Sequence, residues 1–106
     1  MTNKIYRIDK FIVPDHAKEE FLSRVREAHE ILRTLPGFVS NIMVEKTAGN
    51  GSFNYVTIAE WATQEAIESA KKELDALREV NNFNPQEMLD RLGIQADLAI
   101  YKAIDL

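Results

Sequence analysis

Few side chains in this sequence have the chemistry of a catalytic group. The chain has no cysteine and only two histidines, which excludes thiol nucleophiles, zinc thiolates and disulfide bridges. His29 falls at the margin of the apolar stripe of a predicted helix, and its ordinary pKa suits a general base. His16 falls on the polar side of the same helix, so the spacing of the pair predicts no metal site. The remaining candidates are aromatic or hydroxyl side chains: Tyr55, Thr57, Trp61 and Tyr101.

Three of these candidates share one face of the segment at residues 53–61, which alternates as a β-strand. That face carries an aromatic residue at both ends, and the opposite face is also largely apolar, with Val56 and Ile58. A strand directs successive side chains to opposite faces, so this strand is predicted to lie in the middle of a sheet, covered on both sides. Thr63 is predicted to cap the helix that follows.

The other elements are indicated by residue spacing and by proline and glycine breaks. Strands are predicted at residues 5–13, 38–46 and 96–104, with a turn at 47–52. Asp15 is predicted to cap a helix at residues 16–34, whose apolar residues recur every three or four positions. A second helix follows Thr63. A short third helix is predicted at residues 85–92, with Asn84 as its N-cap and Gly93 at its end.

This order of elements predicts an α+β fold. Right-handed crossovers give a ferredoxin-like split βαβ arrangement, a four-stranded antiparallel sheet with the first and third strands central and the helices on one face. The helices leave the other apolar face uncovered, so a second copy of the sheet is the natural cover. We therefore expect residues 1–106 to form a single α+β barrel domain that pairs as a homodimer through the sheet face.

Composition narrows the possible partners and the location. With 106 residues, 45% hydrophobic and 28% charged, the chain has the composition of an ordinary soluble globular protein. A net charge of -4 and the absence of clustered lysine and arginine argue against a nucleic-acid or anionic-membrane partner. Residues 1–10 lack an apolar leader segment and no run is long enough to span a bilayer, so we expect a cytoplasmic protein.

Four short motifs resemble the antibiotic biosynthesis monooxygenase family: EEFL at residues 19–22, PGF at 36–38, VTIAEW at 56–61 and TQEA at 63–66. The resemblance covers most of residues 5–80 and the last strand. It implies a dimeric α/β barrel. In the family's best-known enzymes an aromatic, quinol-like substrate is oxygenated by O2 without flavin, metal or haem. The electron-rich substrate reduces oxygen itself, so the protein need only deprotonate, orient and desolvate it.

The resemblance also implies roles for the candidate residues, with no cofactor and no metal. Trp61, which matches the family, and His29 are the expected catalytic residues, and Tyr55, Thr57 and Tyr101 the expected contacts of a small aromatic ligand. They would line a closed apolar pocket of roughly several hundred cubic ångströms. Three positions depart from the family pattern: Thr57 stands in place of an asparagine, Ile67 in place of a tyrosine, and a residue near Asn81 in place of an arginine.

Two alternatives can be weighed against this hypothesis. In the haem-degrading branch of the fold, the asparagine, tryptophan and histidine would fall at Lys10, Ala70 and Val80, none of which can ligate or distort haem, so the sequence argues against that activity. The other alternative is a non-catalytic dimeric barrel, a small-molecule binder or a stress-related protein. In that protein Trp61 and its neighbours would simply fill the core, since an indole buries a large apolar surface.

Overall fold

Four strands form one antiparallel sheet in the computed structural model, which describes residues 4–106 and leaves the first three residues of the expected domain outside it. The strands are β1 (Ile5–Ile12), β2 (Phe38–Glu45), β3 (Tyr55–Trp61) and β4 (Gln95–Lys102). Their order across the sheet is β2-β3-β1-β4, and every neighbouring pair is antiparallel. The first and third strands are therefore central, as the sequence predicted.

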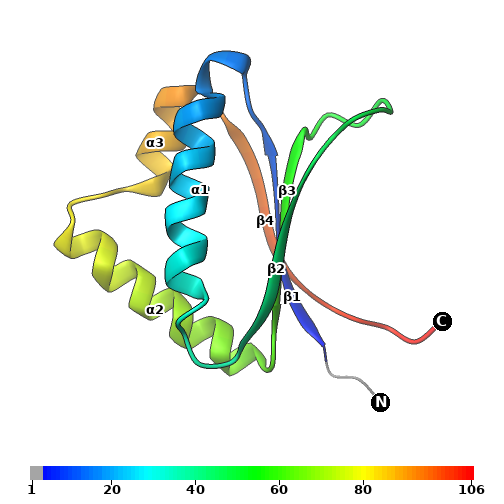
Figure 1. Cartoon of the computed structure of the whole chain (residues 1–106), viewed down its shortest axis with the longest axis vertical. Coiled ribbons are helices and arrows are strands. Elements are labelled where there is room, and N and C mark those ends of the chain that lie inside the picture. The colour runs from blue at the N-terminus through cyan, green and yellow to red at the C-terminus, as the bar shows by residue number, and fades with distance from the viewer. Residues whose placement is uncertain (1–3) are drawn as a thin grey trace.

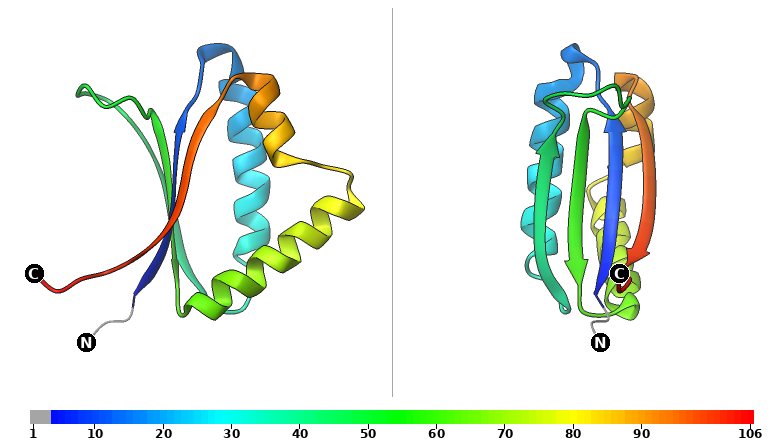
Figure 2. Two further views of the ribbon diagram at one scale, coloured as in Figure 1. Left: turned by 180° about the vertical axis from the view of Figure 1, so that it is seen from behind. Right: turned by 90° about the vertical axis from the view of Figure 1, so that its right-hand side faces the viewer.

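All the helices lie on one face of this sheet (Figure 1). They are α1 (Lys18–Leu32), α2 (Gln64–Val80) and α3 (Pro85–Leu92), with a 3-10 turn at Asp15–Ala17 before α1. Figure 2 shows the opposite face of the sheet with no helix over it. The ferredoxin-like α+β fold expected from the order of elements is confirmed. Within residues 4–106, no helix has the length and apolarity required to cross a bilayer.

Two of the three predicted helix caps form. Thr63 Oγ1 accepts a hydrogen bond from the amide of Ala66 at 3.1 Å, and Asn84 Oδ1 accepts one from the amide of Glu87 at 3.1 Å. These bonds satisfy amides that have no partner inside their own helices. The predicted cap at Asp15 is wrong: Asp15 begins the 3-10 turn, and its carboxylate pairs with Lys18 at 3.1 Å instead.

A β-bulge near the start of β2 shifts its side-chain alternation. Phe38 lies opposite Trp61, yet Asn41, three positions later, lies opposite Ala59, which is two positions before Trp61. The extra residue in β2 allows both Phe38 and Asn41 to face the helices. Beyond the bulge Met43 and Glu45 also face the helices, while Ser40, Ile42 and Val44 point to the uncovered side.

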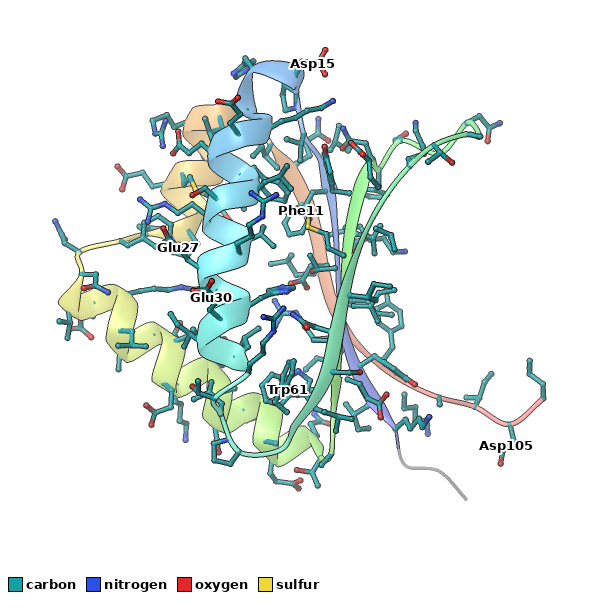
Figure 3. The ribbon with its side chains drawn as sticks, in the orientation of Figure 1. Phe11, Asp15, Glu27, Glu30, Trp61 and Asp105 are labelled. Carbon is teal, nitrogen blue, oxygen red and sulfur yellow. The ribbon has the colours of Figure 1, made fainter. Side chains whose placement is uncertain are left out.

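The core between helices and sheet divides into two apolar clusters. One contains Phe11, Val13, Ala17, Phe21, Tyr55, Met88, Leu89, Leu92 and Ile94, and the other contains Ala59, Trp61, Ile67 and Ala70. Edge-to-face aromatic pairs occur in both, with ring centroids 4.8 Å apart for Phe11 and Phe21 and 5.4 Å apart for Phe38 and Trp61. Figure 3 places Phe11 and Trp61 at opposite ends of this layer.

Polar residues occupy the middle of the helix-facing sheet surface, between the two clusters. Thr57 pairs with Met43 on one side and with Asp9 on the other, and the next row contains Asn41, Ala59 and Arg7. We call Asn41, Thr57, Asp9 and Arg7 the polar belt. Its members lie under the helices, where polar side chains need partners from neighbouring elements.

Gly37 fixes how β2 begins relative to α2. Its φ is 83°, a conformation that favours glycine, and a Cβ atom at this position would lie 2.4 Å from the Cβ of Ala66 in the first turn of α2. The amide of Ala62 donates a hydrogen bond to the carbonyl of Gly37 at 2.8 Å. The turn therefore packs closely against the end of β3 and the start of α2.

Candidate functional site

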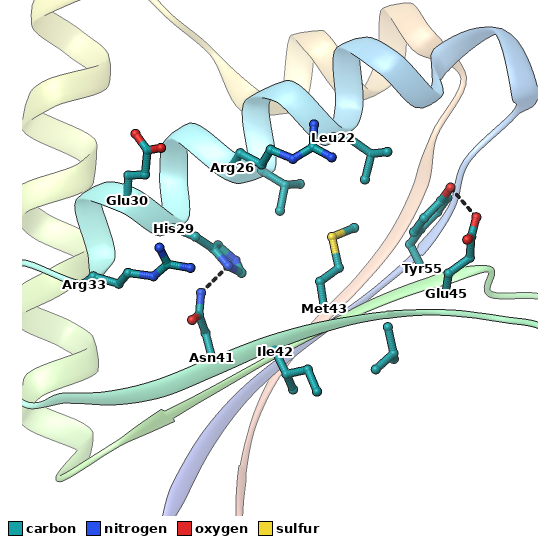
Figure 4. A pocket seen from close by; sticks show the side chains of 12 residues that line it. Leu22, Arg26, His29, Glu30, Arg33, Asn41, Ile42, Met43, Glu45 and Tyr55 are labelled. Atoms are coloured by element: carbon teal, nitrogen blue, oxygen red, sulfur yellow. Dashed lines mark hydrogen bonds between the residues drawn. The ribbon is translucent and has the colours of Figure 1, made fainter.

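A cleft of about 560 Å³ lies between α1 and the β2 side of the sheet (Figure 4). Its apolar lining comes from Leu22 and Val25 on α1 and from Met43 on β2. Its polar lining comes from Arg26, His29, Glu30, Arg33, Asn41, Glu45 and Tyr55. The cleft has the size of a small-ligand site and combines an apolar surface with a few convergent polar groups.

The polar groups on α1 follow from helical spacing. Arg26, His29 and Arg33 are three and four residues apart, so they project from one side of the helix. Figure 4 shows His29 directed at the sheet and Arg33 extending along the helix toward His29. Glu30 points away from the sheet. The helix therefore presents two cations and an imidazole to the cleft.

His29 is joined to the sheet by a hydrogen bond between its Nδ1 and Nδ2 of Asn41. An amide N–H can only donate, so Nδ1 accepts, and the proton of the neutral imidazole resides on Nε2. Burial, and then the positive charge of Arg33, lower the pKa of His29 below its ordinary value. The ring is thus held in a fixed orientation and is neutral near pH 7, with the N–H of Nε2 as its hydrogen-bond donor.

Tyr55 and Glu45 form a second polar pair at the other end of the cleft. Tyr55 is a buried residue, and its hydroxyl donates a hydrogen bond of 2.6 Å to Oε2 of Glu45 on the neighbouring strand. The hydrogen bond to the Glu45 carboxylate stabilises the protonated phenol and raises the pKa of Tyr55, and burial raises this pKa further. The phenol therefore stays protonated, and its oxygen can still accept a hydrogen bond from a ligand hydroxyl.

The cleft brings together two of the five side chains that the sequence singled out, His29 and Tyr55. Trp61 and Thr57 are buried, with 3% and 6% of their surface exposed, and neither lines the cleft. Tyr101 lies opposite Tyr6 and points to the uncovered face of the sheet. The space also differs from the closed apolar pocket we expected, because it is open to solvent and has polar residues along both walls.

Sequence reasoning missed Asn41, Glu45, Arg26 and Arg33. The two arginines recur around His29 at helical spacing, but nothing in that spacing distinguishes them from the other charged residues of a surface helix. Asn41 and Glu45 had no signal of their own, because regular alternation from Phe38 would have pointed them to the uncovered face, and only the bulge in β2 turns them toward the helices.

A half-buried ion pair lies on the same sheet face, on the central strand β1. Arg7 Nε is 2.6 Å from Asp9 Oδ1, and the two side chains are 32% and 21% exposed. Burial raises the pKa of Asp9, and the charge and hydrogen bond of Arg7 act in the opposite direction. The pair satisfies two members of the polar belt within a single strand.

The described side chains include no cluster of metal-ligating groups. Over residues 4–106 no group of three or more histidine, aspartate or glutamate residues is placed to hold a metal ion. Of the positions that correspond to the haem-degrading pattern, Lys10 points to the uncovered face, Ala70 is buried in the core and Val80 is exposed near the end of α2. Lys10, Ala70 and Val80 therefore do not form a set of iron ligands.

Comparison with known proteins agrees with this fold. Residues 5–79 match the antibiotic biosynthesis monooxygenase family, whereas no curated protein matches the chain. A structure of SnoaB, a cofactor-independent oxygenase from Streptomyces nogalater, is similar with a TM-score of 0.73 and 20% identity, over 99% of this chain and 97% of that one. A structure of the haem degrader MhuD from Mycobacterium tuberculosis, with two haems bound, is similar with a TM-score of 0.70 and 19% identity, over 96% and 98%.

At these identities the two structures show the shared fold. The family match supplies more, because it covers well over half of the chain and includes α1, β2 and β3, which line the cleft. The chain therefore belongs to the antibiotic biosynthesis monooxygenase family.

Proposed function

We propose that the protein is an oxygenase that uses O2 to oxidise a small aromatic or quinol-like compound in the cleft between α1 and β2, without flavin, metal or haem. The observation that carries the proposal is the position of the His29–Asn41 pair in a cleft that Tyr55 also lines. Family membership supports an oxygenase-type function. The cleft supplies the rest: an apolar lining for a ring and two polar pairs for its oxygen atoms.

The chemistry needs no electron source other than the substrate. Deprotonation of an aromatic hydroxyl or of an adjacent activated CH2 gives an electron-rich anion that can transfer an electron to O2. When oxygen adds to the activated carbon, a peroxide forms, and loss of water from it leaves a carbonyl. One oxygen atom then remains in the product and the other leaves as water. The protein contributes by orienting the ring, removing the proton and limiting water.

We assign the proton transfer to His29. With the Asn41 amide as it stands, Nε2 carries the proton and can donate a hydrogen bond to a substrate oxygen. A half-turn of the amide would present its oxygen to Nδ1, move the proton there and make Nε2 the basic nitrogen. Tyr55 would accept a hydrogen bond from a second substrate hydroxyl. Trp61 and Thr57, in the buried layer, would support β3, which carries Tyr55.

We also propose that the uncovered sheet face pairs with a second copy of the chain. Its apolar side chains include several that are exposed in the single chain: Ile42 at 57%, Val44 at 42% and Tyr101 at 39%. Exposed apolar side chains gathered on one face favour association. Sedimentation should show a dimer at micromolar concentration, and Ile42→Glu should shift it to a monomer. A wild-type protein that sediments as a monomer would contradict this proposal.

Oxygen consumption tests the proposed activity. The purified protein is mixed with hydroquinones and anthrones, and O2 uptake is followed with an electrode against a buffer blank. We expect faster uptake with at least one compound and a loss of that excess in His29→Ala. His16→Ala, on the exposed 3-10 turn, is the matched histidine control. If no compound is consumed faster than in buffer while aromatic compounds still bind, the protein is the non-catalytic binder considered above.

A further inference from the structure

Two arginines line the cleft without a charged partner. Over residues 4–106, neither Arg26 nor Arg33 forms a side-chain hydrogen bond or an ion pair with another residue. Each of the other arginines has a carboxylate within reach: Asp9 for Arg7, Glu27 for Arg24, Asp75 for Arg78 and Glu20 for Arg91. Arginine pairing is thus complete outside the cleft and missing inside it.

The carboxylates that line the cleft do not neutralise these two arginines. Glu45 accepts the Tyr55 hydroxyl at the far end, and Glu30 points away from the sheet (Figure 4). A guanidinium presents several donors in a fixed plane that matches a carboxylate, so an unpaired arginine in a cleft favours an anionic ligand group.

The two arginines line the cleft at different points along its helical wall. They are two helical turns apart, about 10 Å along the axis, and His29 lies between them. Figure 4 shows Arg33 extending toward His29 and Arg26 extending along the helix toward Leu22. Arg26 would therefore turn back toward His29 to share a ligand group with Arg33. The positive charge of Arg33 is the second cause, smaller than burial, of the lowered pKa of His29, so the electric field of Arg33 reaches the imidazole. The negative charge of an anion bound in this region would counteract the effect of the Arg33 charge on His29.

We propose that the ligand of the cleft is an aromatic compound with an acidic group, such as a carboxylate, which pairs with Arg26 and Arg33 while the ring packs on Val25 and Met43. The inference rests on the proposed function for the aromatic character of the ligand, and it adds the acidic group. Pairing at the arginines would fix the ring along the cleft and bring a ring hydroxyl to His29. Arg26 and Arg33 are then specificity-determining residues.

The test compares two probes with the same ring system, 2-naphthoate and its uncharged amide, 2-naphthamide. Binding is measured by calorimetry at low salt. We expect the wild-type protein to bind naphthoate about tenfold more tightly than the amide, and Arg26→Gln or Arg33→Gln each to weaken naphthoate binding about fivefold without changing amide binding. The double variant should bind both probes equally.

Arg24→Gln is the matched control, because Arg24 is on the same helix but stacks on Phe83, 4.4 Å from the ring centroid, and pairs with Glu27. It should bind both probes like the wild type. A second readout is the His29 imidazole signal in NMR titrations: naphthoate should raise the pKa of His29 and the amide should not. This readout separates binding at the cleft from binding elsewhere on the protein.

Three outcomes would overturn the acidic-ligand inference: equal affinity of the wild-type protein for both probes, an acid preference that persists in the double variant, and no binding of naphthoate at millimolar concentration. None of them bears on oxygen consumption by neutral hydroquinones, which is measured separately. Conversely, an acid preference that depends on Arg26 and Arg33 would stand even if no quinol were turned over.

Discussion

Asn41 donates a hydrogen bond from Nδ2 to Nδ1 of His29, and this bond directly connects the edge strand β2 with α1. It determines which imidazole nitrogen carries the proton and aligns the ring with the cleft. The amide and the imidazole therefore act as one unit, and a change in either one should alter how the other interacts with a ligand.

Asn41→Asp should raise the pKa of His29. A carboxylate beside Nδ1 favours the imidazolium, so the pKa of His29 should move upward relative to the wild type. NMR titration of the imidazole Cε1–H signals measures this, with His16→Gln used to assign them. Asn41→Leu, which removes the bond without adding charge, is the control. Equal titration of Asn41→Asp and the wild type would contradict the contact.

His29 should make stability depend on pH in a defined direction. Its pKa in the folded protein is lowered, so the unfolded chain takes up a proton first as the pH falls through about 6.5. The free energy of unfolding of the wild type should therefore decrease as the pH falls through that window. The free energy of unfolding of the His29→Gln variant should decrease less. Urea unfolding at about pH 7.5 and about pH 5 tests this, and parallel losses in both proteins would refute it.

Tyr55→Phe should affect activity more than stability. It removes the hydroxyl that donates to Glu45 at 2.6 Å but keeps the buried ring. We expect a loss of about 1 kcal/mol in the free energy of unfolding and a fall of about tenfold in quinol-dependent O2 uptake. Tyr6→Phe, on the uncovered face, is the control and should keep the wild-type rate. Unchanged uptake in Tyr55→Phe would remove Tyr55 from the site.

Gly37→Ala should be strongly destabilising. The substitution combines a positive φ of 83° with a Cβ placed 2.4 Å from Ala66, and together these should cost about 2 to 4 kcal/mol. Two glycines separate the contributions. Gly49 has a φ of 104° with no atom near its would-be Cβ, so Gly49→Ala should cost about 1 kcal/mol. Gly51→Ala has neither constraint and should be near neutral. Chemical denaturation ranks the three, and equal costs would contradict the packing of the turn.

Trp61→Ala should cost about 3 to 5 kcal/mol and Trp61→Phe about 1 to 2 kcal/mol, because the indole is only 3% exposed and packs edge-to-face on Phe38. Thermal and urea unfolding measure both losses. Oxygen uptake per folded molecule of Trp61→Phe then separates packing from catalysis. A rate that falls only with the folded fraction makes Trp61 a packing residue, whereas a rate that falls further makes it catalytic.

Local signals in the sequence predicted the elements that depend on local chemistry. The bounds of α3 were predicted as residues 85–92, where Asn84 caps the helix and Gly93, with a φ of 72°, ends it. The cap of α2 at Thr63 is likewise as predicted. These features involve residues a few positions apart, so their physics is contained in the local sequence.

Long-range contacts explain where the strand and helix ends differ. Residues 53 and 54 were predicted to open the third strand, which begins at Tyr55. The backbone of Asn54 still bonds Phe11 and Lys46, each at 2.9 Å. Its side chain also pairs with Val13: Oδ1 accepts from the amide at 2.8 Å, and Nδ2 donates to the carbonyl at 2.9 Å. A side chain that bonds the backbone of a residue 41 positions away leaves no trace in the alternation pattern.

The site was predictable only in part, for the same reason. His29 and Tyr55 could be found because their chemistry and helical or strand position are visible in the sequence. Asn41 could not, because a regular strand starting at Phe38 would have pointed it away from the helices. The bulge that corrects its direction depends on the packing of Phe38 against Trp61, which no short segment encodes.

The polar belt between the two apolar clusters has a consequence for how this fold can diversify. The clusters at the two ends of the helix-facing layer provide most of the buried apolar contact, and the belt contributes little of it. Substitutions at positions such as 41 or 57 are therefore tolerated more easily than substitutions at Phe11 or Trp61. A lineage that inherits this scaffold can exchange one set of reactive groups for another while its folding remains secured elsewhere.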